Sequence, residues 1–168
     1  IQILGDTVDL TGNARVNASG KTGGGEILIG GSYQRSDETV PNAQNTLVDQ
    51  GVQISADALQ TGDGGKVVVW SDGKTVFSGN ISARGGKKSG DGGVVEVSGK
   101  QTLAYNGLVD LSAPRGQAGS LLLDPLNFTI GTDITGADLS AQLGLSNVIV
   151  QTADSGAEAG NIYVNDSV

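Results

Sequence analysis

The chain has 168 residues, a formal net charge of -8 and 28 glycines, and aromatic residues make up 4% of it. The acidic charge argues against nucleic acid or an anionic lipid surface as a partner, because both favour a basic face. Cysteine and histidine are absent, which excludes disulfides, thiolate and imidazole catalysis and the usual zinc ligands. No apolar run approaches the roughly 18 residues of a membrane helix, so we expect no membrane insertion.

The first residues alternate in the manner of a strand, with apolar side chains at Ile1, Ile3, Val8 and Leu10. This pattern begins midway through a strand, and the chain contains no methionine. We therefore expect a piece excised or processed from a longer protein.

One unit then recurs five times: a short strand ending in Ala, a glycine-rich turn, and a second apolar strand. Its copies read RVNA…GGEILI (15–29), QISA…GGKVVV (53–69), NISA…GGVVEV (80–97), DLSA…AGSLLL (110–123) and VQTA…AGNIYV (150–164). A repeated strand unit that cannot bury its own apolar face is typical of a solenoid. The sequence predicts an all-β, parallel β-helix that spans 1–168 as a single segment.

The glycine before each second strand sets the coil length. These glycines are Gly25, Gly65, Gly93, Gly119 and Gly160, and the two middle intervals are the shortest. The basic coil is therefore about 26–28 residues long, a period typical of solenoid repeats. The longer first and last intervals predict insertions at about 32–45 and 131–146, the second with a short helical pattern at 138–145. Further strands at 46–48, 75–78 and 102–105 supply a third side, so we expect triangular coils in five to six rungs.

Period-2 alternation separates two faces of the second strands. The predicted core consists of Ile27, Ile29, Val67, Val69, Val95, Val97, Leu121, Leu123, Ile162 and Val164. A second inward column is predicted at Val16/Ala18, Ile54/Ala56, Ile81/Ala83, Leu111/Ala113 and Val150/Thr152. The outward side carries an apolar stripe of Leu28, Val68, Leu122 and Tyr163, with Trp70 beside it. Such a stripe must be covered by an insertion or by a neighbouring molecule. We expect Trp70 to be a packing plug rather than a sugar platform.

The glycine clusters at 23–25, 62–65, 90–93 and 116–119 open strands rather than helices, which favours corners with positive φ over phosphate-binding loops. Aspartates lie at these predicted corners, where Asx turns account for them; they are Asp63, Asp72, Asp91 and Asp154. A calcium site there is a weaker alternative, since the nonapeptide calcium repeat is absent.

No constellation of catalytic groups stands out, so we do not expect an enzyme. The closest candidates are Glu96 beside Lys66, and Asp110 one coil away from Ser82, and both fit solvated charge pairing. Four N-x-[ST] sequons make Asn17, Asn80, Asn127 and Asn165 candidate glycosylation sites. We expect no resident cofactor.

Several strings carry a family resemblance as a set. They are GGEILIGGSYQ (24–34), VPNAQ (40–44), GGKVVVWSDG (64–73), GGVVEVSGK (92–100) and LLLDP (121–125). Together they resemble the shaft of filamentous-haemagglutinin-type exoproteins, large bacterial adhesins exported by two-partner secretion. The resemblance covers Gly24 to Val164 and implies a right-handed parallel β-helix. Some members of that family are glycosylated at such sequons.

The resemblance implies a secreted, cell-surface protein that acts as the shaft of an adhesin. Its partners would be the outer-membrane pore during export and a receptor or glycan on a host or neighbouring cell. Two alternatives stay open. In the first alternative, the chain is a processed subunit whose partner is itself and which stacks end to end into extracellular matrix fibres. In the second, it is a glycan- or calcium-binding module. The end-stacking alternative assumes that both ends expose unpaired coils.

Overall fold

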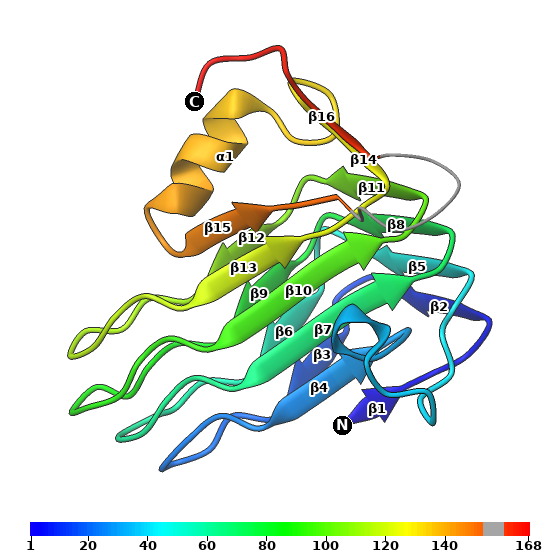
Figure 1. Ribbon diagram of the computed structural model, residues 1–168. Helices are drawn as coiled ribbons and strands as arrows, with labels where there is room; N and C mark the ends of the chain where they lie inside the picture. The colour runs from blue at the N-terminus through cyan, green and yellow to red at the C-terminus, as the bar shows by residue number, and fades with distance from the viewer. Residues whose placement is uncertain (153–159) are drawn as a thin grey trace.

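The computed structural model is a mostly β protein built around three parallel sheets, and it describes residues 1–152 and 160–168. Figure 1 shows the strands aligned one above another, with the N-terminus at one end of the stack and helix α1 (Gly136–Leu143) at the other. The chain visits the sheets in a repeating order, so neighbouring strands in a sheet come from successive repeats. The all-β class is confirmed, and the arrangement is consistent with a parallel β-solenoid.

Each sheet collects one side of the repeats. Sheet A contains β1 (Gln2–Ile3), β4 (Glu26–Ile29), β7 (Lys66–Ser71), β10 (Val94–Gly99), β13 (Ser120–Leu123) and β15 (Asn147–Val150). Sheet B contains β2 (Thr7–Leu10), β5 (Asn45–Val48), β8 (Lys74–Phe77) and β11 (Thr102–Tyr105). Sheet C contains β3 (Arg15–Asn17), β6 (Gln53–Ser55), β9 (Asn80–Ser82) and β12 (Leu108–Asp110). A separate parallel pair, β14 (Asn127–Ile130) and β16 (Asn161–Val164), lies near α1.

The register of sheet A confirms the predicted core through four repeats. Glu26 lies beside Lys66, Lys66 beside Val94, and Val94 beside Ser120. The inward residues are completely buried: Ile27, Ile29, Val67, Val69, Val95, Val97, Leu121 and Leu123. They form one core with inward residues of sheets B and C. Burial of each such side chain contributes roughly 1.5–3 kcal/mol relative to exposure, so this core supplies the main stabilisation.

The fifth copy of the repeat does not continue sheet A. The strand that continues it is β15, whereas the second strand of the fifth copy is β16. Ser120 pairs with Asn147, so β15 follows β13 by one ordinary coil. Ile162 and Val164, which the sequence places in the core, are instead 44% and 64% exposed on β16. β15 and β16 have the same alternating pattern. β15 is the one that pairs with β13, because it lies one ordinary coil length beyond it.

The second inward column is confirmed as buried at Ile54, Ala56, Ile81, Ala83 and Leu111, but two finer expectations for it are wrong. Val109 pairs with Ile81, so Leu111 falls two residues later, at the position held by Ala83 one repeat earlier. Val150 lies in sheet A rather than in the second inward column. The sequence DLSA (110–113) is similar to NISA (80–83), so aligning the two by sequence gives a register that is wrong by two residues. A shift of two residues keeps the same residues facing inward, which is why the pattern alone does not reveal it.

Most corner glycines are required by close stacking rather than by positive φ. A Cβ on Gly24 would lie 1.8 Å from the Ala56 carbonyl oxygen, and one on Gly64 would lie 1.9 Å from that of Ala83. Within the predicted clusters, Gly62 and Gly90 have positive φ, at +88° and +118°. Glycine is therefore needed mainly where one repeat touches the next.

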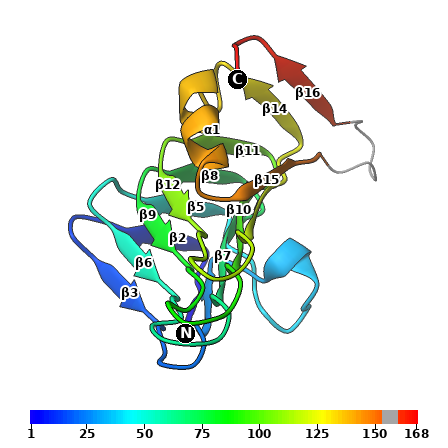
Figure 2. The ribbon, with the colours of Figure 1, turned by 90° about the vertical axis from the view of Figure 1, so that its left-hand side faces the viewer.

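The first insertion occupies residues 30–44, close to the predicted bounds, and includes the short helix η1 (Tyr33–Arg35). Figure 2 shows it outside the stack, beside sheet A. Its entry is fixed by Gly30, because a Cβ there would lie 2.2 Å from the Trp70 carbonyl oxygen.

Residues 131–146 are not an extra insertion, because β15 follows β13 by one ordinary coil. They contain α1, which begins and ends two residues before the expected helix. Thr135 caps it by accepting a hydrogen bond from the backbone N–H of Asp138. The helix contacts β12 and β15, and it stands where another strand of sheet C would follow β12. It therefore covers this part of the end of the stack.

Candidate functional site

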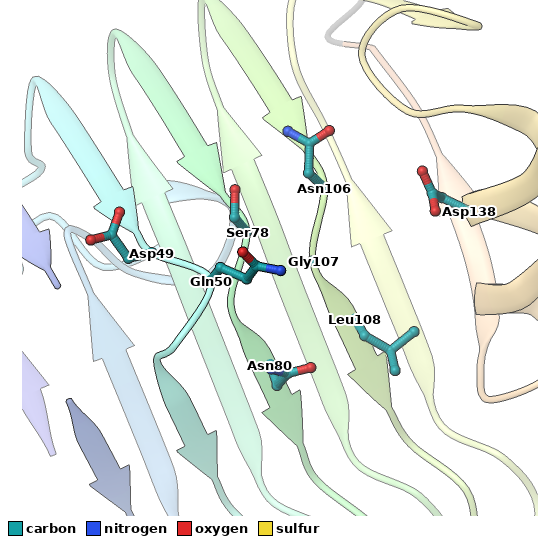
Figure 3. A pocket seen from close by; sticks show the side chains of 8 residues that line it. All are labelled: Asp49, Gln50, Ser78, Asn80, Asn106, Gly107, Leu108 and Asp138. Atoms are coloured by element: carbon teal, nitrogen blue, oxygen red, sulfur yellow. The ribbon is translucent and has the colours of Figure 1, made fainter. Parts of the chain in front are cut away.

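A polar groove crosses the corner between sheets B and C (Figure 3). Its walls come from the loops that follow β5, β8 and β11, and from α1. The lining residues are Asp49, Gln50, Ser78, Asn80, Asn106, Gly107, Leu108 and Asp138. This set offers carboxylates, carboxamides and a hydroxyl, but it lacks a cationic group and an aromatic platform. The groove suits hydrogen bonding to a polar or cationic ligand.

The outer face of sheet A is covered by the first insertion. Leu28, Val68 and Trp70 are buried there together with Val40 of the insertion, and Tyr33 packs against them. This confirms for Leu28, Val68 and Trp70 that an insertion covers the apolar stripe. Leu122 is also buried, whereas Tyr163 is 52% exposed and does not belong to the stripe.

Asp72 ties the first insertion to the sheet. Its Oδ1 accepts hydrogen bonds from Trp70 Nε1 at 3.3 Å and from Asn42 Nδ2 at 3.4 Å. Arg35 Nε lies 3.3 Å from the same oxygen. Trp70 is therefore held at both its apolar ring and its polar edge, and the expected packing plug is confirmed.

Glu96 is 0% exposed and lies beneath the same insertion. Its register neighbours are Val68 and Leu122, so the expected pairing with Lys66 is wrong. Lys66 instead pairs with Glu26 at 3.2 Å, and both side chains are about half exposed. Glu96 Oε2 accepts a hydrogen bond from the backbone N–H of Gln34 at 2.7 Å.

Burial raises the pKa of Glu96 to about 7, and the negative charge of Asp124 adds to this effect. Hydrogen bonds from Gln34 and Ser98 act in the opposite direction. Burial, followed by the charges of Glu96 and Asp124, also raises the pKa of Tyr33. The first insertion therefore encloses a small acidic cluster, which sequence reasoning missed because the alternation alone places Glu96 on an open face.

An ion pair on sheet C links successive repeats. Arg84 Nη2 lies 2.7 Å from Asp57 Oδ2, and Arg84 Nε lies 4.0 Å from Asp110 Oδ2. Burial raises the pKa of Asp57, but the hydrogen bonds and charge of Arg84 outweigh it, so the pKa is lowered. Asp110 lies beside Ser82 in register, as expected. Ser82 Oγ also donates to Asp57 Oδ2 at 3.2 Å, so ion pairs and hydrogen bonds in this cluster join successive repeats.

Two corner aspartates bridge repeats instead of forming Asx turns. Asp63 Oδ1 accepts from the backbone N–H of Asp91, and Asp91 Oδ1 accepts from that of Gln117, both at 2.8 Å. Each of these contacts uses one carboxylate oxygen, Oδ1. The corner expected at Asp154 lies outside the described residues. Within residues 1–152 and 160–168, no three side chains of His, Cys, Asp or Glu are grouped in a way that could hold a metal ion.

The four candidate glycosylation sites, Asn17, Asn80, Asn127 and Asn165, are all exposed. Asn80 also lines the polar groove. The side chain of Asn17 accepts a hydrogen bond from Ser19 N–H, and that of Asn127 accepts one from Asn161 N–H. Their exposure is compatible with modification.

No protein-family model matches the chain, and a search of curated proteins finds no match. Among the helices that the structure describes, none has the length and apolar character needed to cross a membrane.

Proposed function

We propose that the chain is a length of the shaft of a secreted bacterial surface adhesin. In this proposal the coils are triangular and right-handed, each takes about 26–28 residues, and they stack in five to six rungs. The observation that carries it is the continuous in-register stacking of sheet A from β1 to β15, with a buried apolar column on its inner side. Such stacking gives a self-supporting rod whose length grows with the number of repeats.

The mechanism is display. Each repeat rests on the previous one through a backbone ladder, an apolar core and bridges such as Asp63 to Asp91. None of these contacts requires a disulfide, so the chain can cross the outer-membrane pore unfolded and refold outside coil by coil. The binding region for a host or neighbouring-cell receptor or glycan then lies elsewhere on the parent protein. The resemblance of residues 24–164 to haemagglutinin-type shafts supports this role.

Immunogold labelling of intact cells tests the proposal. An antibody raised against this chain should decorate projections at a distance from the outer membrane, and the reactive polypeptide should be far larger than this segment. Label confined to the cytoplasm would contradict the proposal.

A second candidate is a subunit that stacks end to end into matrix fibres. The positions of β1 and β15 favour it, because they are the two end strands of sheet A and each pairs with a neighbour on one side in the sheet order. An edge strand can pair with a strand of another chain. However, α1 covers β12, so the expectation that whole coils are open at both ends is wrong for this part of the stack. Light scattering on the purified chain tests it: mass that grows with concentration supports stacking, and a constant monomer mass opposes it.

The polar groove supports a third candidate, a glycan- or calcium-binding module. Asp49→Ala and Asp138→Ala should then abolish binding in a glycan array or in calcium titration calorimetry. Absence of any binding by the unmodified chain would contradict this role.

A further inference from the structure

The first insertion closes directly over a buried acid. Gln34, whose N–H binds Glu96 Oε2, stands in the left-handed region with φ of +48°. The other oxygen of Glu96, Oε1, is buried and has no hydrogen-bond partner among the described residues. The same is true of Asp124 Oδ1, and the charge of Asp124 acts on Glu96. Two unpartnered acceptors therefore lie in one covered acidic cluster.

The charged groups around Glu96 do not neutralise it. Tyr33 of the insertion and Asp124, which follows β13, interact electrostatically with Glu96. The cations on the insertion and on β7 are Arg35 and Lys66, and Lys66 Nζ lies 6.0 Å from the centre of the Tyr33 ring. Arg35 pairs with Asp72, and Lys66 pairs with Glu26. Within the described part of the chain, Glu96 has no ion pair. Ionisation of Glu96 would therefore leave a buried, uncompensated charge near a second carboxylate, which is costly.

A proton on Glu96 removes this conflict. It cancels one of the two like charges, and it converts a carboxylate oxygen without a donor into a hydroxyl that can donate. The backbone contact from Gln34 to Oε2 is compatible with the protonated form. Opening of the insertion is the other way to relieve the conflict, because the Glu96 carboxylate then gains water.

We propose that the first insertion is a pH-gated cover: it lies over sheet A while Glu96 carries a proton, and it lifts away when Glu96 ionises. Lifting breaks the Gln34–Glu96 hydrogen bond and uncovers the apolar side chains of Leu28, Val68 and Trp70. The rod itself stays intact, since the core lies on the other side of the sheet. This inference rests on the geometry of the cover and does not depend on the proposed shaft role.

Trp70 is the single tryptophan of the chain, so its fluorescence reports the cover directly. We would record emission wavelength and acrylamide quenching of the whole chain between pH 5.5 and 8.5, with circular dichroism to follow the sheets. Below the transition Trp70 should be blue-shifted and protected. Above it the emission should shift to the red and quenching should rise several-fold, while the sheet signal stays constant. Emission and quenching that do not change with pH would overturn the proposal.

Three variants separate Glu96 from other titrating groups. Glu96→Gln keeps the shape without the charge, so Trp70 should stay protected at every pH. Asp124→Asn removes the neighbouring charge, so the midpoint should move to lower pH. Asp9→Asn, a change at an exposed carboxylate on β2 outside the insertion, should leave the midpoint unchanged. A transition that persists in Glu96→Gln, or a midpoint that does not fall in Asp124→Asn, would contradict the proposal.

Discussion

The side chain of Gln142 hydrogen-bonds to both backbone groups of Val109. Its Oε1 accepts from Val109 N–H at 3.0 Å, and its Nε2 donates to the Val109 carbonyl oxygen. The carboxamide thus supplies the donor and acceptor that a peptide group of another strand would supply. It also accepts a hydrogen bond from the Tyr105 hydroxyl at 2.9 Å. One side chain of α1 therefore closes the edge of β12.

Replacement of Gln142 should destabilise the protein strongly. Gln142→Leu keeps the volume but leaves the buried Val109 groups and the Tyr105 hydroxyl unpartnered, and each such group costs about 1–3 kcal/mol. We expect the free energy of unfolding in urea to fall by at least about 2 kcal/mol. Leu143→Ala, an exposed change on the same helix, should stay within about 0.5 kcal/mol. A Gln142→Leu protein as stable as the wild type would show that the cap is unimportant.

The stability of the chain should decrease as pH rises from about 4.5 to above 7. Glu96 binds its proton more tightly in the folded state, where its pKa is about 7, than in the unfolded state, where it is 4.5. Its contribution is complete below the unfolded pKa and is lost as pH rises through the folded pKa, by at most about 3 kcal/mol, since lifting of the insertion limits the loss. Urea unfolding at several pH values measures this, and in Glu96→Gln the decrease should vanish. A wild-type curve that rises across this range would refute the assignment.

Removal of the Trp70 ring should loosen the first insertion. Trp70→Ala leaves a cavity beneath Val40 and Tyr33, and large-to-small changes of this kind cost about 3–5 kcal/mol. Trypsin should then cut faster after Arg35, which lies in the exposed part of the insertion. Tyr163→Ala is the control, since this aromatic is exposed and lies outside the insertion. Equal cleavage rates in the two variants would argue against Trp70 as the anchor.

Adjacent glycines in one corner should differ sharply in their tolerance of alanine. At Gly24 a Cβ would meet the Ala56 carbonyl oxygen at 1.8 Å and Gly65 N at 2.3 Å, both backbone atoms. At Gly23 the nearest atom would be the Asp63 carbonyl oxygen at 3.8 Å, an ordinary contact. Gly24→Ala should lower the melting temperature by many degrees or prevent folding, while Gly23→Ala should be neutral or slightly stabilising. Similar melting temperatures for the two would contradict the tight stacking of repeats.

Local alternation is enough to predict the sheets but not their end. In β4, β7, β10 and β13 the eight inward residues predicted for the core are apolar and buried, so this part of the core follows directly from the pattern. Near the end, β15 and β16 carry the same pattern, and the choice between them depends on which strand lies one coil length beyond Ser120. The spacing of apolar residues predicts the helix, but the replacement of a sheet C strand by Gln142 depends on a long-range contact that no local pattern encodes.

In the candidate sites, too, local patterns predict some features, whereas others depend on long-range contacts. Coverage of Leu28 and Val68 follows from the cost of exposing an apolar stripe. Burial of Glu96 does not, because a single acidic residue on an outward position is expected to be solvated until the path of residues 30–44 is known. The groove of Figure 3 likewise joins three separate loops and a helix, so its lining emerges only once the repeats are stacked.

Electron microscopy of the native material, combined with intact mass of the polypeptide, tests the shaft proposal most directly. With coils about 4.8 Å apart, five to six rungs span about 25–30 Å. If the chain is a length of shaft, micrographs should show this segment as part of a longer continuous rod on a polypeptide far heavier than 16.8 kDa. Uniform fibres built from separate chains of that mass, with an axial repeat equal to the length of one such stack, would contradict it and identify a self-assembling matrix subunit instead.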